Sequence, residues 1–294
     1  MANTKINRGV GHRIADVVIY LFIALLSLIC IIPFFHVISV SISSDAAVLS
    51  NQVWFLPHEI TFQAYKTVLG DSSMMRSFGF TIIITVLFTA LGLALTICSA
   101  YALSRNRLKG RSAINIIFVM TMYFAAGVIP DYLLMDTLNL LDTAAVLILP
   151  LAISAYNMII LRTAMQAIPA SLEEAAQLDG CGDFRILVQI MLPLVIPTLA
   201  TLALFYAVGR WNSYADALYY IQSDSLKPLQ LKLYNLVAAA ADSSALEGDG
   251  GQTAQAEEVI KSATIMFATI PIIIVYPFLQ KYFVSGAMVG AVKE

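Results

Sequence analysis

The sequence predicts an all-α integral membrane protein with six transmembrane helices and both termini in the cytoplasm. About 59% of its 294 residues are hydrophobic and 12% are charged, whereas an ordinary soluble domain carries about 25% charged residues. Six stretches are long and apolar enough to provide the roughly 20 helical residues that cross a bilayer. These stretches are continuously apolar rather than alternating, which favours helices over a β-barrel.

The expected membrane spans are residues 14–40, 80–103, 113–133, 143–161, 194–214 and 263–282. The first is longer than the roughly 7–15 apolar residues of a signal peptide, so we expect it to remain as a membrane anchor. Segment 104–112 carries four basic residues and no acidic residue, and the positive-inside rule places it in the cytoplasm. Residues 1–13 then form a cytoplasmic N-terminus, and residues 14–294 form a single transmembrane domain.

Two connections between the spans are unusually long. Residues 162–193 are expected in the cytoplasm, and residues 215–262 are expected outside. The external connection contains the polar, acidic and glycine-rich stretch 242–251. Such a stretch is typical of an exposed loop tip that is either disordered or contacts a partner.

The cytoplasmic connection carries signals for two short helices. Ser171 and Glu174 have the spacing of a capping box, so the first helix should begin there. Glu173 and Glu174 would lie favourably at the positive end of its dipole. Gly180 fits the left-handed position that ends a helix, and Asp183 can cap a second helix over residues 184–190. Such a pair of helices suits either docking to another protein or an amphipathic connector on the bilayer.

The same connection resembles the EAA loop of binding-protein-dependent importer permeases. The residues that match its spacing are Glu174, Ala175, Ala176, Gly180, Ile190, Leu192 and Pro193. Residues 280–293 are similar to the tail of the second, maltose-type carbohydrate permease subunit. Residues 11–14 and 33–37 resemble the branch that serves complex polysaccharide fragments such as alginate. The resemblance implies a type I ABC importer permease fold.

The resemblance also implies partners and a location. The implied protein partners are a second homologous permease that completes a heterodimer, two ATPase subunits and an external substrate-binding protein. The implied substrate is an oligosaccharide. The implied location is the lipid of a bacterial cytoplasmic (inner) membrane, which the chain would cross several times. The chain has no G-x-x-x-x-G-K-[ST] phosphate loop, so ATP and magnesium are expected in the ATPase. We therefore expect a transport subunit without cofactor, rather than an enzyme. A net charge of −2 disfavours nucleic acid, and three histidines without a metal-site spacing predict no metal.

By the same resemblance, each segment acquires a role. The helix 171–179 would transmit ATPase movement, with coupling residues Ser171, Glu173, Glu174, Ala175, Ala176, Gly180, Ile190, Leu192 and Pro193. The tail residues expected on the ATPase are Gly286, Gly290 and Lys293. The external residues expected on the binding protein are Asp242, Glu247 and Asp249.

Candidate substrate contacts are polar or aromatic residues at membrane depth, because sugars need hydrogen bonds and flat apolar faces. They are Tyr156, Asn157, Trp211, Asn212 and Tyr214. Residues of these types also pack helices together and line membrane interfaces. Oligosaccharides from alginate or pectin fit the polysaccharide branch, while malto-oligosaccharides and other glycans stay open.

Two other functions compete with the importer. An ion-coupled secondary transporter usually buries ionisable residues at mid-membrane, and the six spans are nearly free of them. A membrane enzyme would need a convergent group of acids, bases or metal ligands, which the sequence does not indicate. The EAA spacing favours the importer over both.

Overall fold

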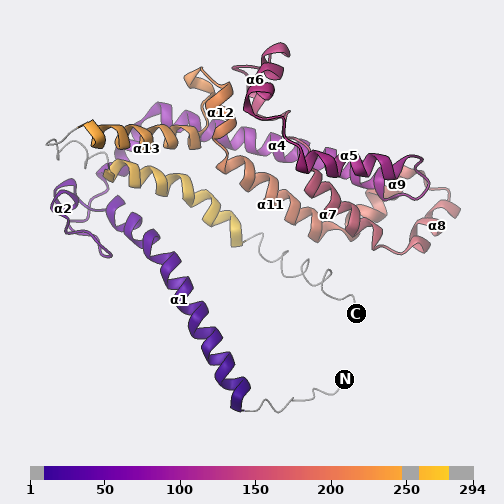
Figure 1. The fold of residues 1–294 in the computed structure, drawn as a ribbon, viewed down its shortest axis with the longest axis horizontal. Helices are drawn as coiled ribbons and strands as arrows, with labels where there is room; N and C mark the ends of the chain where they lie inside the picture. Colours follow the sequence, from indigo (N-terminus) through magenta and orange to yellow (C-terminus); the bar gives the residue numbers. More distant parts are fainter. Residues whose placement is uncertain (1–9, 247–257, 278–294) are drawn as a thin grey trace. The chain divides into compact units, whose positions relative to one another are not determined.

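The computed structural model describes residues 10–246 and 258–277, and over these ranges the chain is mostly helical and contains no strand (Figure 1). The chain divides into two compact units. The first comprises Met1–Gly70 and Leu236–Phe267, and the second comprises Asp71–Asn235 and Ala268–Glu294. The all-α prediction is confirmed within the described ranges.

The first unit begins with α1 (Val10–Ser41), a 32-residue helix that confirms the first expected helix. Its apolar side chains between residues 17 and 35 are mostly exposed, as suits a helix covered by lipid or by another membrane helix. Two short helices follow, α2 (Asp45–Leu49) and α3 (Gln63–Gly70). The Ser44 hydroxyl begins α2 by accepting the backbone N–H of Ala47 at 3.2 Å.

The second unit is built on α4 (Ser72–Ser104), which packs along α7 (Ala155–Gln166) and α11 (Ile196–Asn212) (Figure 1). Gly92 permits this close packing, since an added Cβ would lie 2.9 Å from both the Ala152 carbonyl oxygen and the Tyr206 ring. The Tyr206 hydroxyl is hydrogen-bonded to the Thr96 hydroxyl at 2.7 Å. These contacts hold α11 and the residues just before α7 close to α4.

Three described helices are long and apolar enough to cross a membrane, and two sharply bent helix pairs could raise that number to five. The three helices are Ala15–Ser41, Ser72–Ser104 and Glu258–Pro277. The bent pairs are Arg111–Tyr123 with Val128–Thr137, at 116°, and Asp183–Leu194 with Ile196–Asn212, at 84°. The first, second, fifth and sixth expected spans thus each contain a long apolar helix or part of a bent pair.

Two of the expected spans are not continuous helices, and both predictions are wrong in that respect. Residues 113–133 are divided between α5 (Arg111–Tyr123) and α6 (Val128–Thr137), because Gly127 between them has φ 95°. Residues 143–161 begin with the short η1 (Ala144–Leu147) and an irregular stretch containing Pro150, which cannot continue a helix ladder. The helix α7 that follows is about 18 Å long, shorter than the roughly 30 Å hydrocarbon layer.

The expected external connection is largely helical. It forms α12 (Ala215–Tyr220), η3 (Asp224–Leu226) and α13 (Leu229–Leu246). The Asp142 carboxylate accepts the backbone N–H groups of Gln222 at 3.0 Å and Ser223 at 2.8 Å. The Thr81 hydroxyl accepts the N–H of Leu229 at 2.8 Å. The prediction that a loop tip begins at residue 242 is therefore wrong, because the alanine-rich helix α13 continues to Leu246. Residues 247–257, the rest of the predicted tip included, lie outside the described part of the chain.

Candidate functional site

The EAA segment forms the expected helix–turn–helix: α8 (Ala170–Leu178), then α9 (Asp183–Ile186), η2 (Leu187–Met191) and α10 (Leu192–Leu194). Gly180 ends α8 with φ 77°. Its N–H donates to the Gln177 carbonyl at 3.0 Å, and the N–H of Cys181 donates to the Ala176 carbonyl at 2.9 Å. This pair of bonds is a helix-ending motif that needs a left-handed residue. The conformation expected of Gly180 is confirmed.

The two expected side-chain caps are wrong. Helix α8 starts at Ala170, directly after Pro169, and no side chain caps it. Ser171 is consequently already inside the helix, where its hydroxyl cannot serve as an N-cap. Helix α9 is preceded by Gly182, and the Asp183 carboxylate forms an ion pair with Arg107 instead of capping the helix.

The inner face of α8 is fixed to the end of α4. Glu173 forms an ion pair with Arg105, and the two side chains are only 18% and 11% exposed. The Arg105 guanidinium lies 4.7 Å from the Tyr101 ring centroid, a cation–π arrangement, and its Nε donates to the Ser104 hydroxyl at 3.1 Å. Ala176 is buried in a cluster of residues from α4, α7, η2 and α11. A displacement of α8 must therefore strain or carry the end of α4.

The outer face of α8 is open to solvent. Leu178 is 90% exposed, and Glu174 and Ala175 are exposed beside it. Within the described residues the Glu174 carboxylate has no hydrogen-bond or ion-pair partner. The predicted coupling residues thus divide into two sets. Exposed are Ser171, Glu174, Ala175, Gly180 and Pro193, and wholly or partly buried are Glu173, Ala176, Ile190 and Leu192.

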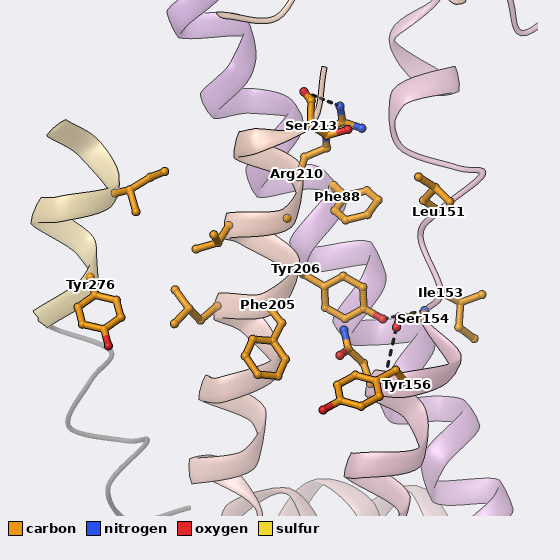
Figure 2. A pocket seen from close by; sticks show the side chains of 15 residues that line it. Phe88, Leu151, Ile153, Ser154, Tyr156, Phe205, Tyr206, Arg210, Ser213 and Tyr276 are labelled. Atoms are coloured by element: carbon orange, nitrogen blue, oxygen red, sulfur yellow. Dashed lines mark hydrogen bonds between the residues drawn. The ribbon is translucent and has the colours of Figure 1, made fainter. Parts of the chain in front are cut away.

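The second unit also contains a cavity of about 870 Å³ between α4, α7, α11 and residues 272–276. Figure 2 shows Phe205 and Tyr206 projecting from α11 and Tyr156 from α7 at this cavity. Tyr156 and Asn157, two of the predicted substrate residues, line it. Its walls are mainly aromatic and apolar with a few polar groups, which is the usual character of a small-molecule site.

Tyr206 lies at the centre of the cavity wall. Its hydroxyl accepts the backbone N–H of Ser154 at 3.1 Å, drawn as a dashed line in Figure 2. Its ring meets Phe88 edge to face, with centroids 5.8 Å apart. Sequence reasoning missed this residue, because a tyrosine inside an apolar run gives no sign of its bonding partners.

Arg210 is the other cavity residue that the sequence analysis missed. It is 3% exposed on α11, and its Nη2 donates to the Asp216 carboxylate at 3.0 Å while Nη1 donates to the Leu147 carbonyl oxygen at 2.9 Å. Burial alone raises the pKa of Asp216. The hydrogen bond and positive charge of Arg210 and the hydrogen bond from Ser213 outweigh that effect and lower the pKa. Asp216 is therefore ionised at neutral pH beside the Arg210 guanidinium, and the span 194–214 contains a buried arginine.

Three predicted substrate residues do not join the two α7 residues at this cavity. Trp211 is buried, and its ring N–H donates to the Ala268 carbonyl oxygen at 3.1 Å. The Asn212 amide bonds back to its own helix. Tyr214 stacks on Tyr234 with ring centroids 4.7 Å apart. In this structure Trp211 and Tyr214 contact neighbouring elements, whereas Asn212 is exposed and bonds only to its own helix.

The structure describes only one of the residues predicted to contact the binding protein or the ATPase through the tail. Asp242 lies on α13. Outside the described residues are Glu247, Asp249, Gly286, Gly290 and Lys293. The ranges 10–246 and 258–277 contain no group of three or more side chains able to hold a metal.

Comparison with known proteins places the chain in a family. Residues 102–289 match the model of the binding-protein-dependent transport system inner membrane component. The chain is 41% identical over 286 residues, 96% of this chain and 99% of the relative, to the polygalacturonan/rhamnogalacturonan transport system permease protein YtcP of Bacillus subtilis (strain 168). It is also 41% identical to protein LplC of Bacillus subtilis (strain 168), over 294 residues that make up 100% of this chain and 98% of the relative.

A solved structure is similar over the same extent. It belongs to a bacterial ABC transporter involved in the import of the acidic polysaccharide alginate, with 36% identity, a TM-score of 0.85 and coverage of 94% of this chain and 99% of that one. The resemblance drawn from the EAA spacing is confirmed, as is the prediction of a transport subunit rather than an enzyme. The chain belongs to the family of binding-protein-dependent transport system inner membrane components.

Proposed function

We infer that this chain is the permease subunit of an ATP-driven ABC importer that takes up oligosaccharides delivered by a substrate-binding protein. The observation that carries the inference is the exposed helix α8 with EAA spacing, in a chain 41% identical over nearly its whole length to a polygalacturonan/rhamnogalacturonan permease. An ion-coupled carrier has no use for such a docking helix. ATP and magnesium would bind to the partner ATPase, because this chain lacks a phosphate loop.

In the assembly we propose, residues 14–294 form one transmembrane domain of a bacterial cytoplasmic (inner) membrane. It crosses six times, with residues 113–133 and 143–161 as broken spans and both termini inside. A second homologous permease completes a heterodimer, and two ATPase subunits lie beneath α8 and the tail at 286–293. A binding protein docks outside, against residues 215–262 and the acidic side chains at 242, 247 and 249. The basic segment 104–112 supports this orientation.

Coupling would use the two faces of α8 differently. Glu174, Ala175 and Leu178 are exposed and available to the ATPase. Glu173 and Ala176 face inward, where they contact Arg105 and the buried cluster. Closure of the ATPases on nucleotide would push α8, and these inner contacts would pass the movement to α4, α7 and α11.

For the substrate we propose acidic oligosaccharides from pectin-like or alginate-like polymers. YtcP is a permease for polygalacturonan and rhamnogalacturonan, and the similar structure is an alginate importer. The cavity offers aromatic faces at Tyr156 and Tyr206 and an amide at Asn157, which suit sugar rings and hydroxyls. Arg210 and Asp216 neutralise each other, so the cavity would let an acidic sugar pass without binding it tightly.

A pair of glycine variants tests the coupling role. Gly180→Val forces a β-branched residue to φ 77°, whereas Gly182→Val places the same side chain at φ −75° with open space around it. In proteoliposomes holding the full importer, Gly180→Val and Glu174→Lys should abolish ATP-driven sugar uptake at normal membrane abundance. Gly182→Val should retain it. Normal uptake in both Gly180→Val and Glu174→Lys would refute the coupling assignment.

A further inference from the structure

A second groove lies between α5 and α7, away from the cavity at Tyr206. Its volume is about 480 Å³, and it follows one face of α5 from Arg111 to Tyr123, with Arg162 of α7 on the other side. The polar members, Arg111, Ser112 and Asn115, come first along α5, and the later members are apolar or aromatic. We call this the α5–α7 groove. Over 13 residues of helix it extends about 20 Å.

The charges at the polar end of this groove are not compensated by the protein. Arg162 donates from Nη1 to the Asn115 side-chain oxygen at 2.9 Å, and Arg111 donates from Nη1 to the Asn106 side-chain oxygen at 2.7 Å. Both acceptors are neutral amides. Neither arginine forms an ion pair with a carboxylate among the described residues, whereas five other described basic residues do: Arg105, Arg107, Arg210, Lys227 and Lys261. The buried Nε of Arg162 has no hydrogen-bond partner in the described structure.

Two positive charges that share one groove repel each other, and a partly buried guanidinium with an unused donor is costly. An anion between the two arginines would offset their repulsion and supply the counter-charge that the described residues do not provide. The remaining walls, at Ile116, Val119 and Met120, are apolar and run away from the charged end. The groove therefore matches a ligand with an anionic head and a hydrocarbon tail.

We propose that the α5–α7 groove binds an anionic phospholipid, with the phosphate between Arg111 and Arg162 and an acyl chain along α5. The proposal uses the membrane orientation given above, in which residue 111 belongs to the basic cytoplasmic segment 104–112. Basic pockets between membrane helices on that side are suited to anionic headgroups. Helix α5 has no buried residue in the isolated chain, so lipid access along its length is open.

The test uses the complete importer in nanodiscs made of equal parts phosphatidylglycerol and phosphatidylcholine. After transfer to detergent, native mass spectrometry counts the lipids that stay bound. The wild type should retain one more phosphatidylglycerol than the Arg111→Gln/Arg162→Gln variant. The affinity should fall roughly 25-fold in that variant, since each basic residue near the membrane surface contributes about fivefold. The Arg111→Lys/Arg162→Lys variant keeps both positive charges and should retain the lipid.

Arg185→Gln is the matched control, because Arg185 also donates to a side-chain amide, that of Gln189 at 2.8 Å, but lies outside the groove. It should leave lipid retention unchanged.

The proposal would be overturned if the double glutamine variant retained as much phosphatidylglycerol as the wild type, or if the wild type retained phosphatidylcholine equally well. Displacement of the lipid by excess inorganic phosphate, which indicates a small-anion site, would overturn it too. A disulfide cross-link from a Val119→Cys variant to the second permease, which would show that this subunit covers the groove, would also overturn it.

Discussion

Replacing Glu173 by alanine should loosen the coupling helix without unfolding it. The Glu173 carboxylate is the partner of Arg105, and both side chains are largely shielded from solvent, at 18% and 11% exposure. Alanine keeps the helical propensity of α8 but leaves the Arg105 guanidinium without its counter-charge. The substitution therefore removes one defined link between α8 and α4.

The structure offers a second ion pair of similar position for comparison. Arg107 and Asp183 also join the end of α4 to the EAA segment, but each side chain is 55% exposed. Losing a partner of a shielded charged hydrogen bond costs about 1–3 kcal/mol, while an exposed pair contributes about 0–1 kcal/mol. For Glu173→Ala the docked state of α8 should therefore be about 5–150-fold less populated. For Asp183→Ala the change should stay below about fivefold.

The assay is the number of ATP molecules hydrolysed per sugar transported in proteoliposomes. Glu173→Ala should raise this ratio well above the Asp183→Ala value. A double-mutant cycle separates the pair from other effects. Arg105→Ala and Glu173→Ala should be strongly non-additive, whereas Arg107→Ala and Asp183→Ala should be nearly additive. If Glu173→Ala and Asp183→Ala change the ratio equally, or if the first cycle is additive, the proposed mechanical link is wrong.

Three further predictions follow from particular contacts. Gly92→Ala should lower thermal stability, since the new methyl would meet a backbone oxygen at 2.9 Å, while Gly79→Ala on the same helix meets nothing within 4 Å and should not; equal melting temperatures would contradict the packing. The lowered pKa of Asp216 means that its ion pair stabilises the fold above about pH 4, and this stabilisation is lost as pH falls through the folded pKa. Acid unfolding followed by fluorescence should accordingly be less steep in Asp216→Asn below that pH, and an unchanged profile would count against the ion pair. Cysteines within 104–112 should be shielded from an impermeant thiol reagent in intact cells and one at Ser244 should be labelled; the reverse pattern would invert the topology.

The long apolar helices could be predicted from sequence because a single property, continuous hydrophobicity, determines them. Helices α1 and α4 follow directly from such runs. The turn at Gly180 could also be predicted, because only one residue type tolerates that conformation at low cost. Gly127 and Pro150 also signal breaks in the sequence, but hydrophobicity averaged over a window of many residues hardly changes at a single glycine or proline.

The polar links between helices could not be predicted, because they join residues that are distant in sequence or beyond one helical turn. Glu173 and Arg105 are 68 residues apart, and nothing in either segment indicates the other. Arg210 donates to Asp216, which lies six residues later and beyond the end of α11. A separation of six residues is not the i,i+4 spacing of side-chain pairs within a helix. The capping box failed for a local reason, since α8 begins at Ala170, directly after Pro169, and Ser171 is already inside the helix.

The most direct measurement is sugar uptake into proteoliposomes that contain this chain, its partner permease, the ATPase pair and the binding protein, with ionophores present to collapse all ion gradients. We expect oligogalacturonide uptake to require both ATP inside and binding protein outside, and to continue when the ionophores are present. Uptake that persists without ATP and stops when the ion gradients are collapsed would contradict this expectation.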